Sequence, residues 1–350
     1  MPDLKAAVIG TGGAARLHLE SYARSPLTQP VAVVSHSPAR AAALATEFSA
    51  GSAEPAIRPY TSIEQMLATE RPDLVSVATL EWDHEAPVLL SLAAGAHVLC
   101  EKIMASTLAS GERMLAAARA AHRTLAVNYN YRAVPTHALI KQALDGGDIG
   151  TPALFAAHMH AYLFPHWLDL MRYFFGDPTE VTATALDDQA LRPPVSTGPS
   201  GRPWVYPTDD PSPMLYHPSI AASATFRFAD PHSPEPAFLA TLSASAFVPL
   251  EENFWSFALY GTRGSFAIDR ATRANLNGTA SLGPIAAQLA ALPPCSYAES
   301  FSLSVAAFAE AVLHHRPAPV TGEDGLAALR LDAALVQSAR TARTVAFAPK

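Results

Sequence analysis

The chain has 350 residues, of which 49% are hydrophobic and 16% are charged, and this is enough for a sizeable core and indicates two domains. Its formal charge of −7, without any cluster of Lys or Arg, argues against a nucleic-acid partner. Two cysteines cannot form a disulfide framework, the N-terminal residues lack the pattern of a leader segment, and no uncharged apolar run reaches membrane-spanning length, so we expect a cytoplasmic protein without a membrane partner.

The first predicted elements are a strand, a glycine-rich turn and a helix. Leu4–Ile9 is apolar, and it is followed by the pattern G-x-G-x-x-A before a helix predicted over Arg16–Arg24. In a dinucleotide-binding unit Gly10 permits the tight turn, Gly12 lets the backbone approach a pyrophosphate, and Ala15 lets the helix pack closely. The helix start also offers free N–H groups and a positive dipole end to phosphate. The predicted cofactor contacts from this turn are Gly10, Gly12, Gly13, Ala14 and Ala15.

The second predicted strand, Val31–Val34, ends without the carboxylate that binds the ribose 2′-hydroxyl in NAD-binding units. Ser35 and Ser37 can donate hydrogen bonds, and Arg40 can pair with a 2′-phosphate. We therefore predict NADP as the cofactor, with NAD possible. The alternative is a solvated helix start with Pro38 as its first residue. The predicted contacts from this segment are Ser35, His36, Ser37 and Arg40.

Strands and helices continue to alternate up to residue 127. Thr61-Ser62-Ile63-Glu64 has the pattern of a capping box at a helix start. The remaining predicted strands are Leu74–Ala78, Val98–Cys100 and Leu125–Val127, and the remaining predicted helices are Asp83–Ala94 and Ser106–His122. This alternation predicts a parallel, doubly wound α/β sheet.

A Glu-Lys pair, Glu101 and Lys102, directly follows the predicted strand Val98–Cys100. In an open α/β sheet the carboxyl ends of the strands are where ligands bind. Lys102 is therefore a candidate for a charged or proton-donating group at a binding site; the alternative is a solvated lysine at a strand end. Cys100 is predicted to be a small buried hydrophobe.

The second half of the chain predicts helices and alternating strands. The predicted helices are Pro135–Leu144, Trp167–Phe175, Ser300–His314 and Asp324–Thr341; the predicted strands are Ala153–His160, Ile220–Phe228, Phe238–Phe247, Phe254–Tyr260 and Ser265–Asp269. Period-two alternation in these strands predicts one buried and one polar face, with a hairpin turn at residues 261–264. Such a sheet face is a natural interface, so we expect a homodimer or homotetramer.

Two stretches in this half are predicted to be irregular. Arg192–Pro213 is rich in Pro, Ser and Gly, and it is either a mobile loop or a lid in which Trp204 and Tyr206 cover a sugar ring. Gly283–Tyr297 is the other irregular stretch.

These motifs, in this order, resemble the Gfo/Idh/MocA family, the glucose–fructose oxidoreductase and inositol dehydrogenase type. The segments that carry the resemblance are residues 10–15, Ala78-Thr79 with His84, and residues 95–102, 128–132, 147–150 and 321–325. The resemblance implies a Rossmann domain over residues 1–127 and, over residues 128–350, a substrate-binding α/β domain with an open, mostly antiparallel sheet. It also implies a nicotinamide cofactor and a sugar or polyol substrate.

The family's Glu-Lys-Pro motif falls on Glu101, Lys102 and Ile103, and the resemblance implies that Lys102 is catalytic. Its later Asp-x-x-x-His motif falls on Tyr162 and His166. Ile103 in place of proline makes the turn less restricted. The implied cofactor contacts are Thr79, Leu80, His84, Glu101 and Lys102; the implied substrate contacts are Lys102, Asn130, Arg132, Tyr162, His166 and Asp169.

Oxidation of a secondary alcohol by nicotinamide, or the reverse, moves one proton to or from oxygen. A lysine beside a cationic ring and away from water has a lowered pKa, and histidine titrates near neutrality. We assign Lys102 to polarising the substrate oxygen and His166 to general acid–base catalysis, and the alternative is that Lys102 carries the proton. The alternative for His166 is a residue at a helix start satisfied by backbone. His158 and His160 share a strand face, but no carboxylate or thiol has ligand spacing beside them, so no metal is predicted.

Two other functions remain open from the sequence. The replacements at Ile103 and Tyr162 permit a nucleotide-binding regulatory or non-catalytic subunit of the same fold. The resemblance also permits redox-neutral glycoside cleavage with a retained cofactor.

Overall fold

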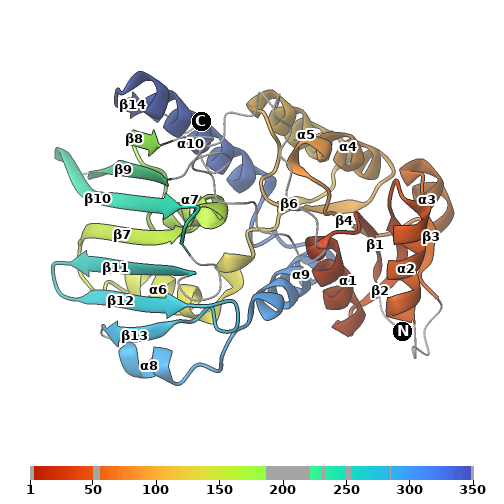
Figure 1. Ribbon diagram of the computed structural model, residues 1–350, viewed down its shortest axis with the longest axis horizontal. Coiled ribbons are helices and arrows are strands. Elements are labelled where there is room, and N and C mark those ends of the chain that lie inside the picture. Colours follow the sequence, from red (N-terminus) through yellow and green to blue (C-terminus); the bar gives the residue numbers. More distant parts are fainter. Residues whose placement is uncertain are drawn as a thin grey trace. The chain divides into compact units, whose positions relative to one another are not determined.

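The computed structural model describes residues 4–49, 56–186, 221–230, 233–248, 254–283 and 285–347 (Figure 1). By the density of its internal contacts the chain forms two units. Within the described residues, the first unit extends to Asn130 and includes Phe301–Leu329, and the second holds the residues between them and those from Arg330 onward. The division into residues 1–127 and 128–350 stays a prediction, to which the structure adds that a late segment belongs to the first unit.

The first unit contains a six-stranded sheet whose strand order is β3-β2-β1-β4-β5-β6. All five strand pairs are parallel, which confirms the predicted doubly wound sheet. The strands are β1 (Leu4–Ile9), β2 (Thr28–Val34), β3 (Arg58–Tyr60), β4 (Leu74–Val77), β5 (His97–Cys100) and β6 (Leu125–Val127). The order reverses between β1 and β4, and ligands of open α/β sheets bind at such a switch point.

The helices of the first unit follow its strands in the predicted alternation. They are α1 (Gly13–Arg24), α2 (Pro38–Ser49), α3 (Ile63–Glu70), α4 (Glu85–Ala93), preceded by the 3₁₀ turn η1 (Glu81–Asp83), and α5 (Leu108–Ala121). From Phe301 onward, α9 (Tyr297–Leu313) also belongs to this unit. The capping box is confirmed, because the Ser62 hydroxyl accepts from the Gln65 backbone N–H at 3.1 Å and starts α3. Apolar residues of α1, α2 and α9 share one core with the sheet.

The second unit contains an eight-stranded sheet with the order β13-β12-β11-β7-β10-β9-β8-β14. Its strands are β7 (Pro152–His160), β8 (Glu180–Leu186), β9 (Ala221–Asp230), β10 (Ser233–Ser245), β11 (Trp255–Gly261), β12 (Ser265–Ala271), β13 (Thr279–Leu282) and β14 (Val345–Ala346). Strands β7 and β10 pair in parallel, and the other printed pairs are antiparallel. The sheet is therefore mostly antiparallel, as the family resemblance implies.

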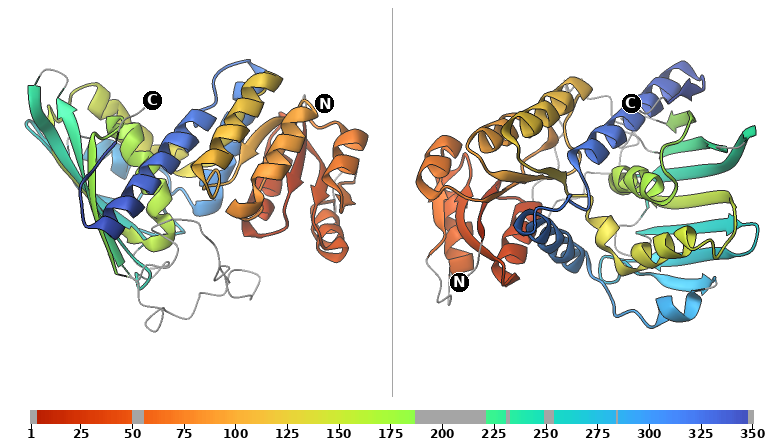
Figure 2. Two further views of the ribbon diagram at one scale, coloured as in Figure 1. Left: turned by 90° about the horizontal axis from the view of Figure 1, so that it is seen from above. Right: turned by 180° about the vertical axis from the view of Figure 1, so that it is seen from behind.

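Among the described residues, helices cover one face of the eight-stranded sheet and leave the other face open. Helices α6 (Pro135–Asp145), α7 (Phe164–Phe175) and the later part of α10 (Gly322–Thr341) cover one face (Figure 2). Along β7, Phe155 and Met159 are buried while Leu154 and His158 are exposed, which confirms the predicted alternation. The hairpin turn is also confirmed, since the Gly261 N–H donates to the Gly264 carbonyl between β11 and β12.

Some predicted boundaries are wrong for identifiable reasons. The stretch Gly283–Tyr297 is not wholly irregular, because it contains the short helix α8 (Ala286–Ala290). Strand β8 was missed because Ala and Thr make up most of its alternation and give a weak apolar signal. Helix α7 begins before Trp167, since Pro165 stabilises its first turn.

The predicted loop or lid over Arg192–Pro213, with Trp204 and Tyr206, lies outside the described residues. Among the helices described, none is long and apolar enough to cross a membrane.

Candidate active site

The turn after β1 has the geometry that a dinucleotide-binding unit requires. Gly10 has φ +125°, and a Cβ atom there would lie 2.3 Å from the Ala78 carbonyl oxygen at the end of β4. Only glycine fits this close approach at the switch point. A Cβ atom at Gly12 would meet nothing within 4 Å, so open space lies beside the turn.

The start of α1 is suited to phosphate. The helix begins at Gly13, Gly12 and Gly13 are exposed, and no acidic residue lies in the first turn. Exposed backbone N–H groups and the positive end of the helix dipole attract an anionic group here. The residues of this turn therefore fit the pyrophosphate of a nicotinamide dinucleotide.

The segment after β2 combines a structural serine with exposed polar groups. The Ser35 hydroxyl lies 3.2 Å from Thr11 Oγ1 and accepts from the Ser37 backbone N–H at 3.3 Å, so it joins the turns after β1 and β2. Helix α2 begins at Pro38, as the structural alternative predicts. Arg40 and His36 are exposed. The exposed guanidinium of Arg40 is accessible to a bound anion.

His84, a predicted cofactor contact, lies within a set of backbone carbonyls. Its side chain is fully buried, and its Nδ1 atom lies 3.0 Å from the Ile103 carbonyl oxygen and 3.3 Å from that of Met104. Its Nε2 atom lies 3.3 Å from the Thr79 carbonyl oxygen. His84 therefore connects the loop after β4 to the loop after β5. Of the two neighbouring predicted contacts, Leu80 is 41% exposed and Thr79 is half-buried.

Lys102 lies immediately after the carboxyl end of β5, between β4 and β6. Its side chain is half-buried, and this burial lowers the pKa of Lys102 to about 8, an effect that the negative charges of Glu101 and Glu81 partly offset. Ile103, which stands where the family has proline, is buried, and its carbonyl is engaged by His84. Lys102 is thus an amine that changes its charge close to neutral pH.

Glu101, another predicted cofactor contact, directs its carboxylate into the protein. Its Oε1 atom lies 2.8 Å from His18 Nε2 and accepts from Asn128 Nδ2 at 2.7 Å. Burial alone raises the pKa of this carboxyl, but the hydrogen bonds from His18 and Asn128, with the charge of Lys102, hold it below its usual value. Burial, together with the negative charge of Glu101, raises the pKa of the Cys100 thiol, which is buried as predicted.

In the second unit, His166 lies in the first turn of α7 and is 1% exposed. Its ring stacks on that of Tyr131, with centroids 4.3 Å apart and planes at 16°. The imidazole of His166 is therefore held by an aromatic stack. Burial raises the pKa of the Tyr131 hydroxyl well above its usual value.

The predicted substrate contacts Arg132 and Asp169 bind each other. Arg132 Nε donates to Asp169 Oδ2 at 2.8 Å, and Arg132 Nη2 donates to Oδ1 at 2.6 Å. Their side chains are 10% and 0% exposed, and the guanidinium also lies over the Tyr173 ring, 5.1 Å from its centroid. This two-point geometry is the strong form of a charge pair, and it holds the Arg132 side chain in place.

Tyr162, which stands where the family has aspartate, lies in the 3₁₀ turn η3 (Ala161–Leu163) and is half-buried. Its backbone N–H donates to His160 Nδ1 at 3.0 Å, and burial lowers the pKa of His160 to about 4. His158 is exposed on the open face of the sheet. The described residues contain no group of three or more His, Cys, Asp or Glu side chains placed to hold a metal ion.

The structure brings the predicted residues together in two sets, one in each unit. The first contains the glycine-rich turn, the segment after β2, His84, Glu101 and Lys102; the second contains Arg132, Tyr162, His166 and Asp169. Asn130, predicted to contact substrate, is buried at the end of the first unit. No motif in the sequence indicated a role at the site for His18 or Asn128. A signal existed for His18, because it shares the apolar face of α1 with Ala15, Leu19 and Tyr22.

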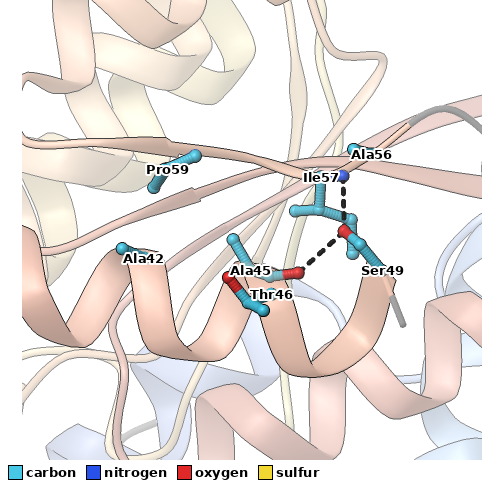
Figure 3. A pocket seen from close by; sticks show the side chains of 7 residues that line it. All are labelled: Ala42, Ala45, Thr46, Ser49, Ala56, Ile57 and Pro59. Carbon is cyan, nitrogen blue, oxygen red and sulfur yellow. Dashed lines mark hydrogen bonds between the residues drawn. The ribbon is translucent and has the colours of Figure 1, made fainter.

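A pocket of about 360 Å³ lies between α2 and β3, apart from these residues (Figure 3). Ser49 lines this pocket, and its hydroxyl donates to the Ala45 carbonyl at 2.7 Å and accepts from the Ile57 N–H at 2.9 Å. None of its lining side chains titrates, and β3 is four strand positions from β5. The pocket therefore supplies no catalytic group.

Comparison with known proteins agrees with this architecture. Residues 4–129 match the oxidoreductase family with an NAD-binding Rossmann fold, and residues 237–347 match the C-terminal alpha/beta domain of that family. The chain is 27% identical over 337 residues to a 1,5-anhydro-D-fructose reductase of Ensifer adhaerens, covering 95% of this chain and 96% of the relative. It is 31% identical over 199 residues to a D-apiose dehydrogenase of Paraburkholderia graminis, covering 51% and 52%.

The fold also matches solved structures. An oxidoreductase from Agrobacterium radiobacter, crystallised with NAD+, L-tartaric acid and magnesium, superposes with a TM-score of 0.77 at 20% identity over 98% of both chains. At this identity the likeness shows the fold. Because the two family matches together span more than half of the sequence and the glycine-rich turn has the expected geometry, the chain belongs to the Gfo/Idh/MocA family of oxidoreductases, with an NAD-binding Rossmann domain.

Proposed function

We propose that the protein interconverts a secondary alcohol and a ketone on a sugar, polyol or related small molecule, with a nicotinamide dinucleotide as the redox partner. The observation that carries this proposal is Lys102, a half-buried amine with a pKa of about 8 at the carboxyl end of β5, in the sheet that contains the dinucleotide turn. The names of its relatives, which include a keto-sugar reductase and an aldose dehydrogenase, support the substrate class.

The residues present fit the cofactor. When bound, the nicotinamide supplies or accepts the hydride. We propose that Gly10 and residues 12–15 hold the pyrophosphate, that Ser35, His36, Ser37 and Arg40 hold the adenosine ribose and its 2′-phosphate, and that Thr79, Leu80 and His84 shape the loop beside it. In this proposal NADP is preferred, since the described segment after β2 has no carboxylate to repel the phosphate.

We propose that Lys102 polarises the substrate oxygen and that His166 moves its proton. In the oxidative direction a neutral group must take the proton from the alcohol, and in the reductive direction a charged group must return it. The Lys102 amine, with a pKa of about 8, exists in both forms within a narrow pH range, so Lys102 is the alternative carrier of this proton. Asn130, Arg132, Tyr162 and Asp169 complete the proposed substrate site, Arg132 and Asp169 acting as a bound pair.

The variant Lys102→Met tests this assignment. It is expected to lose turnover on the substrate by at least about 10³-fold while binding cofactor almost as well as the wild type, since acid–base and electrostatic contributions of this size are typical. Steady-state kinetics and fluorescence titration measure the two properties. Lys141→Met, which removes a lysine paired with Asp145 on α6, is the matched control and keeps turnover. Turnover of Lys102→Met at the wild-type rate would overturn the proposal.

Cofactor preference is tested by Ser35→Asp. A carboxylate beside the proposed 2′-phosphate repels it, so the ratio of the NADP to NAD dissociation constants rises at least about tenfold. Arg40→Gln shifts the ratio in the same direction. Arg24→Gln, at the opposite end of α1 where Arg24 pairs with Glu20, leaves it unchanged. Equal ratios in all four proteins would exclude a 2′-phosphate site at these residues.

The two other functions predict different results from the same protein. Cofactor binding without turnover across a panel of polyols and keto-sugars marks a regulatory or non-catalytic subunit. Product formation from a glycoside without net change in nicotinamide absorbance marks redox-neutral cleavage. The half-buried Lys102 favours the oxidoreductase, because a subunit that only binds nucleotide gains nothing from a desolvated amine.

We also propose a cytoplasmic homo-oligomer. Both cysteines are free and buried, as suits a reducing compartment. Tyr260, Leu154 and Leu239 are exposed at matching positions on three neighbouring strands of the open sheet face. This apolar row supports association through that face, and light scattering of Leu154→Asp measures whether the oligomer dissociates.

A further inference from the structure

A line of buried polar side chains leads through the first unit to the residue next to Lys102. It runs from the Tyr22 hydroxyl to Ser76 Oγ over 2.8 Å, and from Ser76 Oγ to His18 Nδ1 over 3.0 Å. His18 Nε2 then lies 2.8 Å from Glu101 Oε1. Tyr22, Ser76 and His18 are each 0% exposed, so water does not substitute for these contacts.

The donor and the acceptor in these hydrogen bonds are assigned from Asn128 and Glu101, at one end of the line. Asn128 Oδ1 accepts from the Ser304 hydroxyl at 2.8 Å, so the amide nitrogen of Asn128 is the atom that donates to Glu101. An ionised carboxylate only accepts, and His18 therefore donates to it from Nε2. With the imidazole neutral and its proton on Nε2, Nδ1 accepts from the Ser76 hydroxyl, whose oxygen accepts in turn from Tyr22, and this single tautomer satisfies the whole line.

Glu101 depends on these donors to stay ionised. A buried carboxylate without hydrogen-bond donors takes up a proton, because burial penalises its charged form. Two donors reach the same oxygen of Glu101, one from α1 and one from the end of β6. His18 is also fixed from the side by Phe301, whose ring meets the imidazole edge-on with centroids 5.5 Å apart.

We propose that His18 is a positioning residue for the reaction, which acts on Lys102 through the carboxylate of Glu101. The negative charge that His18 maintains on Glu101 favours the ammonium form of the adjacent lysine. The inference rests on the proposed role of Lys102, but it concerns the proton equilibrium of Lys102 and is tested on that amine directly.

The other ionisable groups near this pair are few among the described residues. Glu81, in η1, also favours the charged form of Lys102. Cys100 faces Glu101, but burial raises the pKa of its thiol, so it stays neutral. Burial raises the pKa of Tyr22 as well, and its hydroxyl stays protonated. Glu101 and Glu81 are therefore the negative charges that raise the pKa of Lys102, and Glu101 is the one that His18 contacts.

The experiment measures the reactivity of the Lys102 amine against pH, without substrate. Competitive acetylation with isotope-coded acetic anhydride, read by mass spectrometry of the peptide that contains Lys102, gives the inflection, which is expected near pH 8 in the wild type. Glu101→Gln and His18→Leu both remove negative charge next to the amine, and each is expected to lower the inflection by about one pH unit.

Two further variants separate this role from simple support of the fold. His18→Gln keeps an amide donor close to the place of Nε2, and its inflection is expected to stay within about 0.3 pH units of the wild type. The double variant His18→Leu/Glu101→Gln is expected to shift no further than Glu101→Gln alone, since His18 acts only through Glu101.

Circular dichroism and cofactor titration confirm that each variant is folded, and His18→Phe, which keeps a ring against Phe301, replaces His18→Leu if the latter does not fold. An unchanged inflection in a folded His18→Leu or His18→Phe variant overturns the proposal, as do additive shifts in the double variant. The pH profile of kcat/KM is expected to move with the acetylation inflection. If Lys102→Met keeps full turnover, the proposed function fails while the acetylation result still decides the role of His18.

Discussion

The two units each bury a carboxylate, and they stabilise it in different ways. In the first unit Glu101 accepts from an imidazole and an amide, and a lysine with a pKa of about 8 follows it. In the second unit Asp169 accepts two hydrogen bonds from the guanidinium of Arg132, which stays charged at every pH at which a protein folds. The charge balance around Glu101 therefore changes near pH 8, whereas that of the Arg132–Asp169 pair is permanent. A catalytic amine needs the first kind of surrounding, and a fixed scaffold needs the second.

The largest expected effect comes from breaking the permanent pair. Asp169→Asn leaves the Arg132 guanidinium, 10% exposed, without its counter-charge, and about 3–5 kcal/mol of the free energy of unfolding is expected to be lost. Urea unfolding followed by circular dichroism measures the loss. Asp145→Asn, at an exposed pair on α6, is the matched control, and its change is expected to stay within about 0.5 kcal/mol.

If the pair is only a scaffold, replacing both charges by apolar groups restores stability. The double variant Arg132→Met/Asp169→Leu is expected to recover most of the loss. Recovery of stability together with substrate binding would remove both residues from the proposed substrate site.

The second prediction concerns Lys102 in the first unit, whose replacement is expected to raise the free energy of unfolding. The pKa of Lys102 is lowered in the folded state, so the unfolded chain binds more protons between about pH 8 and 10.5, and the charged lysine destabilises the fold at neutral pH. Lys102→Met is expected to raise the free energy of unfolding by about 2 kcal/mol at pH 7, a value reduced for the partial exposure of the amine. The gain shrinks as pH rises through this range. Lys141→Met is expected to show no such pH-dependent gain, and a loss of stability in Lys102→Met would contradict the inferred burial cost.

The smallest expected effect concerns His137 and tests whether the stability of the second unit depends on pH. Burial lowers the pKa of His137 to about 4, and its Nδ1 lies 2.7 Å from the Tyr131 carbonyl oxygen. Since the unfolded chain binds this proton near pH 6.5, stability is expected to fall by about 1 kcal/mol between pH 6 and pH 5 on this account. Chemical unfolding at these two pH values measures the slope. His137→Leu reduces the slope, while His314→Gln, at an exposed position, retains it.

Local patterns predicted the parts of the fold that depend on neighbours in sequence. The strand, turn and helix at residues 4–24, the Ser62 cap and the hairpin at Gly261–Gly264 each follow from a few adjacent residues, and the structure contains all of them. The placement of Lys102 after β5 followed from the same reasoning. Strand β8 and helix α8 were missed because small residues give little periodic signal.

The side-chain partners at the candidate site depend on folding and could not be predicted in this way. His18 and Glu101 are 83 residues apart, and Asn128 and Ser304 are 176 apart. Arg132 and Asp169 were each predicted to contact substrate, yet their charges bind each other across 37 residues. Periodicity shows which face of a helix is buried, but not which polar group will meet it there.

The late segment that belongs to the first unit gives this family member a discontinuous domain. Val305 and Phe308 of α9 lie in the same core as the parallel sheet, and Thr321 forms a backbone bridge with Ala126 of β6. At Gly325 a Cβ atom would lie 2.4 Å from Val127 Cγ2, so this segment packs on the strand with no room for a side chain. In chain order, the residues between β6 and α9 are an insertion within the Rossmann unit. A fragment that ends at Val127 would lack one wall of its core, and an internally deleted chain that joins β6 directly to α9 is the shorter form expected to fold.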